Sequence, residues 1–86
     1  MQLILYSKPG CHLCEGLEQK LTALPTLEVE LEIRDITTRE DWREAYQYEV
    51  PVLFQRVGEQ EFQLPRPAPR LSAARLEPWL LKVMKS

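Results

Sequence analysis

The chain alternates short apolar runs with amphipathic stretches. The segment QLILY, from Gln2 to Tyr6, stops at the pair Pro9-Gly10, and this pattern predicts a buried strand. A second series, from Leu27 to Arg34, alternates apolar and charged residues strictly, as in a strand with one face in water. Its glutamates favour an edge strand with a solvated face, because charge at an edge discourages unwanted pairing.

Two helices are predicted from spacing. Cys14, Leu17 and Leu21 recur every three or four residues, so a first helix should run from the first turn to near Pro25. A second, short helix should follow a capping box, formed either by Thr37 with Glu40 or by Thr38 with Asp41. Its apolar face would carry Trp42, Ala45 and Tyr46.

The next segments predict a hairpin. PVLFQR, which begins at Pro51, indicates a third strand, and Gly58 turns the chain into a fourth strand over Glu61 to Leu64. The helix before this hairpin must end ahead of Pro51, since the residue preceding a proline disfavours the helical conformation. RPAPR, Arg66 to Arg70, is expected to be a connector, because its prolines cannot join a ladder.

The last helix is predicted to start late. Ser72 has the chemistry of a helix cap, but Pro78 would then lie inside the helix, where its ring and its missing N–H are unfavourable. We therefore expect a separate turn over Ser72 to Arg75 and a helix that begins near Glu77. The predicted order is β-α-β-α-β-β-α.

Composition narrows the class of protein. The 86 residues, 44% hydrophobic and 28% charged, suit one globular domain over residues 1–86. A net charge of −2 with scattered basic residues gives no reason to expect nucleic acid as a partner. No apolar run approaches the roughly 18 residues of a membrane span, and QLILY lacks the basic flank of a signal peptide. We therefore expect a cytoplasmic protein that makes no membrane contact, and we expect it to be a monomer.

Cys11 and Cys14, the only cysteines, carry the candidate chemistry. The turn before Cys11 places it at a helix N-terminus, where free N–H groups and the helix dipole stabilise a thiolate. Cys14 starts the apolar stripe and should be more buried. Three residues apart on a helix, the pair can form a disulfide, so that Cys11 attacks a substrate disulfide and Cys14 resolves the mixed disulfide.

Two other interpretations of the pair stay open. Zinc needs four ligands, whereas this chain offers two thiols and an awkwardly placed His12, so a metal site would need a dimer or outside ligands. The cysteines are alternatively inert, small apolar residues. Lys8 and His12 are the cations near Cys11: each is either a surface residue or a residue that binds substrate or tunes the thiol.

The motifs KPGCHLC after the first strand and EVPVLF before the hairpin, with a closing helix, resemble the glutaredoxins of the thioredoxin superfamily, and most of all short bacterial glutaredoxin-like proteins. This resemblance spans nearly the whole chain. It implies an α/β fold with a four-stranded mixed sheet, helices on both faces and a cis peptide bond between Val50 and Pro51. It also implies that the Val50 backbone pairs with the cysteine of glutathione or a peptide, and that Lys8 holds a glutathione carboxylate.

The sequence differs from the glutaredoxin pattern in three places. The usual C-P-Y-C is C-H-L-C, the usual T-V-P is E-V-P, and LPRPAPRLS replaces the Gly-Gly and Asp that bind the γ-glutamyl end of glutathione. The reductant is therefore either glutathione, as a co-substrate, or a thioredoxin-like protein. Arg70 or Ser72 would serve an anionic group in the changed segment.

The leading hypothesis is a thiol-disulfide oxidoreductase that needs no bound cofactor and reduces protein or glutathione mixed disulfides. Cys11 and Cys14 are its catalytic residues, and Lys8, His12, Val50 and Pro51 its substrate-binding residues. The alternatives are a non-catalytic module that holds an extended peptide beside Val50 and Pro51, and a dimer that binds a metal or an iron–sulfur cluster.

Overall fold

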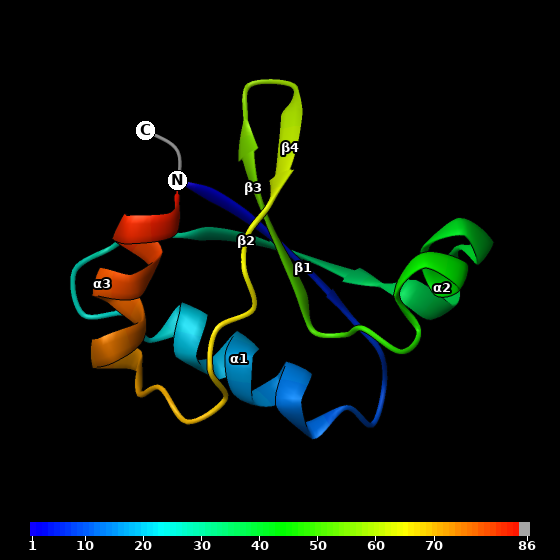
Figure 1. The fold of residues 1–86 in the computed structure, drawn as a ribbon, viewed down its shortest axis with the longest axis horizontal. Helices are drawn as coiled ribbons and strands as arrows, with labels where there is room; N and C mark the ends of the chain where they lie inside the picture. The colour runs from blue at the N-terminus through cyan, green and yellow to red at the C-terminus, as the bar shows by residue number, and fades with distance from the viewer. Residues whose placement is uncertain (85–86) are drawn as a thin grey trace.

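The structure is a computed structural model that describes residues 1–84, so the last two residues of the predicted domain, 85–86, lie outside it. The predicted order of elements is confirmed, with one added 3-10 turn (Figure 1). The elements are β1 (Gln2–Ser7), α1 (His12–Thr22), β2 (Glu30–Asp35), η1 (Ile36–Thr38), α2 (Glu40–Tyr46), β3 (Val52–Val57), β4 (Gln60–Gln63) and α3 (Ala73–Val83).

The four strands form one mixed sheet in the order β2-β1-β3-β4. β1 pairs in parallel with β2, with Leu5 opposite Ile33, and antiparallel with β3, with Leu5 opposite Leu53. Gly58, with φ 62°, makes the turn between β3 and β4. The predicted α/β fold and the edge position of β2 are therefore confirmed.

Each face of the sheet carries its own apolar cluster, because alternate residues of β1 point to opposite sides. Leu3 and Leu5 pack with leucines of α1 and α3, whereas Ile4 and Tyr6 lie on the α2 side. In Figure 1, α1 and α3 accordingly lie together, away from α2. The larger cluster comprises Leu3, Leu5, Leu17, Leu21, Leu53, Leu64, Leu76 and Leu80, and the smaller one Ile4, Tyr6, Ile36 and Val52, with Trp42 and Tyr46 packed against it.

Charged side chains cross the α2 side of the sheet. Arg34 on β2 forms ion pairs with Glu32 and, at 2.9 Å, with Glu61 on the opposite edge strand, and its guanidinium lies 5.4 Å from the centre of the Tyr6 ring. Arg56 on β3 pairs with both glutamates. Hydrogen bonds from Arg34 lower the pKa of each of these carboxyl groups. Glu32 is thus one member of an ionic network rather than only part of a solvated face.

α3 corrects the predicted start of the last helix. It is one helix from Ala73, with Ser72 as the N-cap that accepts a hydrogen bond from the Arg75 N–H, and it continues through Pro78. Pro78 cannot donate to the carbonyl of Ala74, but both residues are exposed, so water can solvate that carbonyl. The side chains of Leu76 and Leu80 stay buried in the core, and the free energy gained by their burial outweighs the local cost of the proline.

Two further expectations were wrong in detail. No capping box starts α2: its N-cap, Arg39, makes no side-chain cap bond. Instead the carboxylate of Asp35 accepts from the Thr37 N–H and caps the preceding 3-10 turn. In addition, β2 begins only at Glu30 rather than at Leu27. The reason is that β1 starts at Gln2, which pairs with Glu30, so β1 has no strand residue to pair with positions 27–29.

Candidate functional site

A tight turn places Cys11 at the start of α1. Pro9 and Gly10 are its central residues, and the Cys11 N–H donates to the Lys8 carbonyl at 3.3 Å. Gly10 has φ 77°, a value that suits the third position of a type II turn and that other residues rarely adopt. Cys11 is therefore the N-cap of α1, as the sequence indicated.

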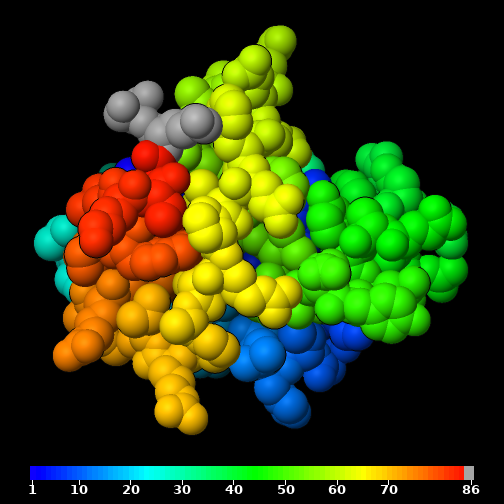
Figure 2. Space-filling model, viewed as in Figure 1, coloured from blue at the N-terminus to red at the C-terminus, as the bar shows by residue number. Residues whose placement is uncertain are grey.

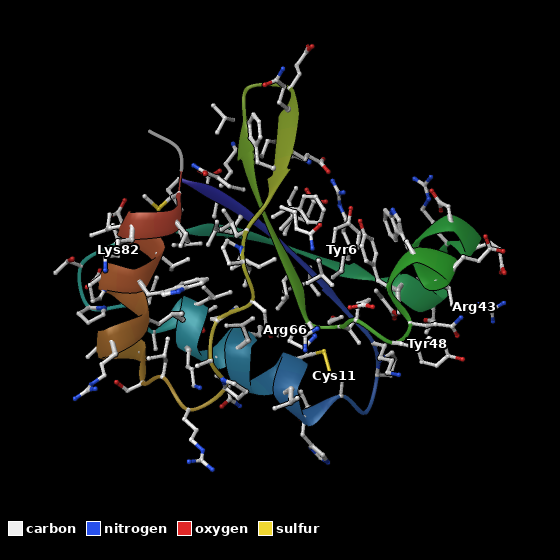
Figure 3. All side chains as sticks on the ribbon, in the orientation of Figure 1. Tyr6, Cys11, Arg43, Tyr48, Arg66 and Lys82 are labelled. Atoms are coloured by element: carbon white, nitrogen blue, oxygen red, sulfur yellow. A yellow bond between two sulfur atoms is a disulfide. The ribbon has the colours of Figure 1, made fainter. Side chains whose placement is uncertain are left out.

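Cys11 and Cys14 are joined by a disulfide, with 5.3 Å between their Cα atoms. The Cys14 N–H donates to the Cys11 sulfur at 3.2 Å, which points a backbone dipole at the sulfur where negative charge would develop. Cys14 is 3% exposed and Cys11 partly exposed, so their burial differs in the predicted direction. An outside group can thus approach Cys11 more easily than Cys14. Figure 3 shows the sulfur pair at this end of α1.

The predicted cis peptide bond between Val50 and Pro51 is present. Pro51 lines the same pocket as His12 and Leu13, which lie between the two cysteines, so the cis bond lies near the cysteine pair. The Val50 N–H already donates to the Tyr46 carbonyl at 3.1 Å. This bond ties the segment before Pro51 to the end of α2, and it occupies one of the two backbone groups expected to pair with substrate.

Lys8 and His12 are both exposed beside the turn. The Lys8 ammonium donates to the Gln47 carbonyl at 3.2 Å, so it links the turn to the end of α2. The His12 imidazole lies 3.7 Å from the Glu15 carboxylate, an ion pair only when the histidine is protonated. Within residues 1–84, no group of three or more His, Cys, Asp or Glu side chains could hold a metal ion.

A pocket of about 230 Å³ lies between α1 and the segment that joins β4 to α3. In Figure 2 the yellow atoms of this segment lie beside the blue atoms of α1. The Lys20 ammonium donates to the Pro69 carbonyl at 2.6 Å, and this bond joins the two sides of the pocket. The lining residues are His12, Leu13, Gly16, Leu17, Lys20, Pro51, Arg66, Pro67, Ala68, Pro69, Leu71 and Leu76.

Sequence reasoning missed most of this pocket. On α1 a signal was present: Leu13, Gly16, Leu17 and Lys20 follow the i, i+3, i+4, i+7 spacing of one helix face. Across the pocket no periodic signal exists, because residues 64–72 form no helix or strand. Arg66 was also missed: its guanidinium donates to the Glu49 carbonyl and so fixes the segment before Pro51.

Comparison with known families decides the relationship that the motifs suggested. Residues 2–81 match the family described as "Glutaredoxin-like domain (DUF836)". The chain belongs to this family. The glutaredoxin-like domain and the Cys11–Cys14 pair are consistent with a role in thiol redox chemistry.

Solved structures agree with the glutaredoxin-like fold. The X-ray structure of Northeast Structural Genomics target protein XcR50 from X. campestris is 28% identical, with a TM-score of 0.62, over 95% of this chain and 99% of that one. The solution structure of the same target is 28% identical, with a TM-score of 0.51, and both chains are covered completely. A search of curated proteins finds no match. No helix within residues 1–84 is long and apolar enough to cross a membrane.

Proposed function

We propose that this glutaredoxin-like domain is a thiol-disulfide oxidoreductase, with Cys11 as the nucleophile and Cys14 as the resolving thiol. One observation carries the proposal: Cys11 is a partly exposed residue whose sulfur caps α1 by accepting a hydrogen bond from the Cys14 N–H, while Cys14 is buried. A helix N-terminus favours the thiolate, which is the form that attacks disulfides.

The reaction takes two exchange steps. The Cys11 thiolate attacks one sulfur of the substrate disulfide, a mixed disulfide forms, and the first substrate thiol leaves with a proton. Cys14 then loses its proton and attacks the Cys11 sulfur, which forms the Cys11–Cys14 disulfide and releases the second substrate thiol. The substrate gains two electrons and two protons, and the protein dithiol is oxidised. A thiol reductant, either glutathione or a thioredoxin-like protein, restores the dithiol.

The groups around Cys11 suit a substrate in a mixed disulfide. Because the Val50 N–H donates to Tyr46, we assign the pairing with the substrate backbone to the Val50 carbonyl. Lys8 uses one donor on the Gln47 carbonyl and retains others for a substrate carboxylate. Pro51 and His12 complete the binding residues by lining the pocket beside the cysteines.

The test is a single-turnover reaction of the reduced protein with hydroxyethyl disulfide, followed by alkylation and mass measurement. Wild type should release two thiols for each protein and end as the Cys11–Cys14 disulfide. Cys14→Ser should release one thiol and retain one mercaptoethanol group on Cys11. Cys11→Ser should lose at least about a hundredfold in rate, since only a buried thiol remains.

The two cysteine variants act as matched controls, because each removes a single sulfur atom from the same turn. A wild-type rate in Cys11→Ser would refute the assignment of the nucleophile. Thiols that stay unreactive in the native wild-type protein would instead favour the non-catalytic peptide-binding module.

A further inference from the structure

We propose that the pocket beside α1 binds an apolar side chain of a protein substrate, from a residue adjacent to the disulfide-bonded cysteine. A carboxylate of the same substrate segment binds to Lys20 and Arg66. This inference rests on the proposed oxidoreductase function and specifies its substrate class: an extended segment with apolar and acidic residues around the cysteine. The pocket adjoins the reacting sulfur, because His12 and Leu13, which lie between the two cysteines, form part of its wall.

The size of the pocket fits one side chain. Its volume is about 230 Å³, below the roughly 300–1,000 Å³ of pockets that hold drug-sized molecules. An apolar cavity of about 150 Å³ is large enough for benzene. A leucine or phenylalanine side chain therefore fits, whereas a whole tripeptide does not.

The chemistry of the walls favours an apolar occupant. Leu13, Leu17 and Leu71 supply apolar surface, and Leu13 is 54% exposed, so it has surface left to bury. Pro67 and Pro69, in the opposite wall, have no N–H to offer a polar ligand. Their fixed backbone, held by the bond from Lys20 to the Pro69 carbonyl, forms the pocket before a ligand arrives, which lowers the entropy cost of binding.

The charges around the pocket favour a carboxylate. His12, Lys20 and Arg66 line it, and within residues 1–84 no acidic side chain does. The Glu15 carboxylate lies 3.7 Å from the His12 imidazole and would offset a positive charge on it, so Lys20 and Arg66 are the cations that an incoming anion would meet. Each uses a donor on a backbone carbonyl and has further donors available. The local charge is thus opposite to the net charge of −2 of the whole chain.

The test uses the reduced full-length protein and short peptides, each as a mixed disulfide with 2-mercaptoethanol. The first peptide is Ac-Glu-Leu-Cys-Leu-Glu-amide, whose symmetrical flanks make the direction of binding irrelevant. This first peptide is called the leucine peptide. The glycine peptide has glycine in place of both leucines, and the lysine peptide has lysine in place of both glutamates. Single-turnover rate constants are divided by that of hydroxyethyl disulfide, which has no side chain for the pocket.

We expect the leucine peptide to react about tenfold faster than the glycine peptide, since a buried leucine is worth that much or more. The leucine peptide, with its two glutamates, should also react about threefold faster than the lysine peptide at low salt. This ratio should fall in 1 M salt, where exposed charges are screened. The net charge of the chain alone would favour the lysine peptide. Equal rates for leucine and glycine peptides, or a preference for lysine, would overturn the proposal.

A matched pair of variants locates the effect. A Cβ at Gly16 would meet no atom within 4 Å, and Gly16 lies on a helix, so Gly16→Leu fills the pocket and favours the helix. It should bring the leucine peptide to within about twofold of the glycine peptide. Gln19→Leu puts the same side chain on an exposed part of α1 and should keep the tenfold preference. A preference that survives in Gly16→Leu would refute the pocket as its source.

The outcomes separate this inference from the proposed function. A protein that reduces hydroxyethyl disulfide through Cys11 and treats all peptides alike is an oxidoreductase without this pocket specificity. A protein that reduces neither hydroxyethyl disulfide nor any peptide refutes both.

Discussion

Arg66 donates a hydrogen bond to the backbone carbonyl of Glu49, and this bond joins the segment before α3 to the segment that carries the cis peptide bond. The two segments are 17 residues apart in sequence. Because Val50 also bonds to the end of α2, the backbone before Pro51 is held from two sides. We infer that Arg66 positions the Val50 carbonyl for a substrate.

Arg66→Met should therefore slow the single-turnover reduction of a peptide mixed disulfide about tenfold. The reason is that a displaced Val50 carbonyl would no longer orient the substrate backbone beside Cys11. Reduction of hydroxyethyl disulfide, which has no peptide backbone, should change less than twofold. Arg75→Met, at an exposed arginine on α3 to which no binding role is assigned, is the matched control and should leave both rates at the wild-type level. Equal losses in the two arginine variants would argue against a specific role for Arg66.

Glu77 links α3 to the segment before β2, and this link should depend on pH. One oxygen of its carboxylate accepts bonds from the Thr26 hydroxyl and from the N–H groups of Thr26 and Leu27. The Thr26 hydroxyl, followed by the two N–H groups, lowers the pKa of Glu77 below its ordinary value of 4.5. A lowered folded-state pKa stabilises the protein above the ordinary value, and the gain is lost as the pH falls through the lowered one.

Glu77→Gln should accordingly unfold at a lower urea concentration than wild type at pH 7, and the difference should shrink between about pH 4.5 and pH 2. Glu28→Gln, at an exposed glutamate in the same segment before β2, serves as the control, with the same midpoint as wild type throughout. A difference for Glu77→Gln that stays constant down to pH 2 would contradict the role of its charge.

Pro78 lies inside α3 and is exposed, so its removal should stabilise the protein. Pro78→Ala restores the N–H that can donate to the Ala74 carbonyl, and we expect the free energy of unfolding to rise by about 1–3 kcal/mol. Pro25→Ala, at an exposed proline outside any helix, should bring no gain. The measurement is the urea midpoint of each variant. A loss of stability in Pro78→Ala would show that the ring itself is needed.

The sequence predicted the elements with strong local signals. Cys14, Leu17 and Leu21 are buried as their spacing indicates, and Pro9-Gly10 places Cys11 at the start of α1 because few turns suit that pair. The cis bond before Pro51 came from resemblance to a family rather than from a local pattern, since most bonds before proline are trans.

The start of α3 and the pocket were mispredicted or missed because both depend on contacts between segments distant in sequence. Burial of Leu76 and Leu80 against the sheet keeps α3 continuous through Pro78, although the local preference is for a break. The bonds from Arg66 to Glu49 and from Lys20 to Pro69 join residues 17 and 49 positions apart, and no periodicity encodes them. The pocket wall formed by residues 66–71 could therefore be located only in the folded chain.

The central claim is that Cys11 and Cys14 exchange with outside thiols as a pair. In the most direct measurement, the protein is equilibrated at a series of ratios of reduced to oxidised glutathione. The free thiols are then alkylated, and the mass of the intact chain is measured by mass spectrometry. We predict that both alkyl labels appear and disappear together, with a midpoint between about −270 and −200 mV, the range from thioredoxin to the glutaredoxins. Cysteines whose labelling is the same at every ratio would contradict the account.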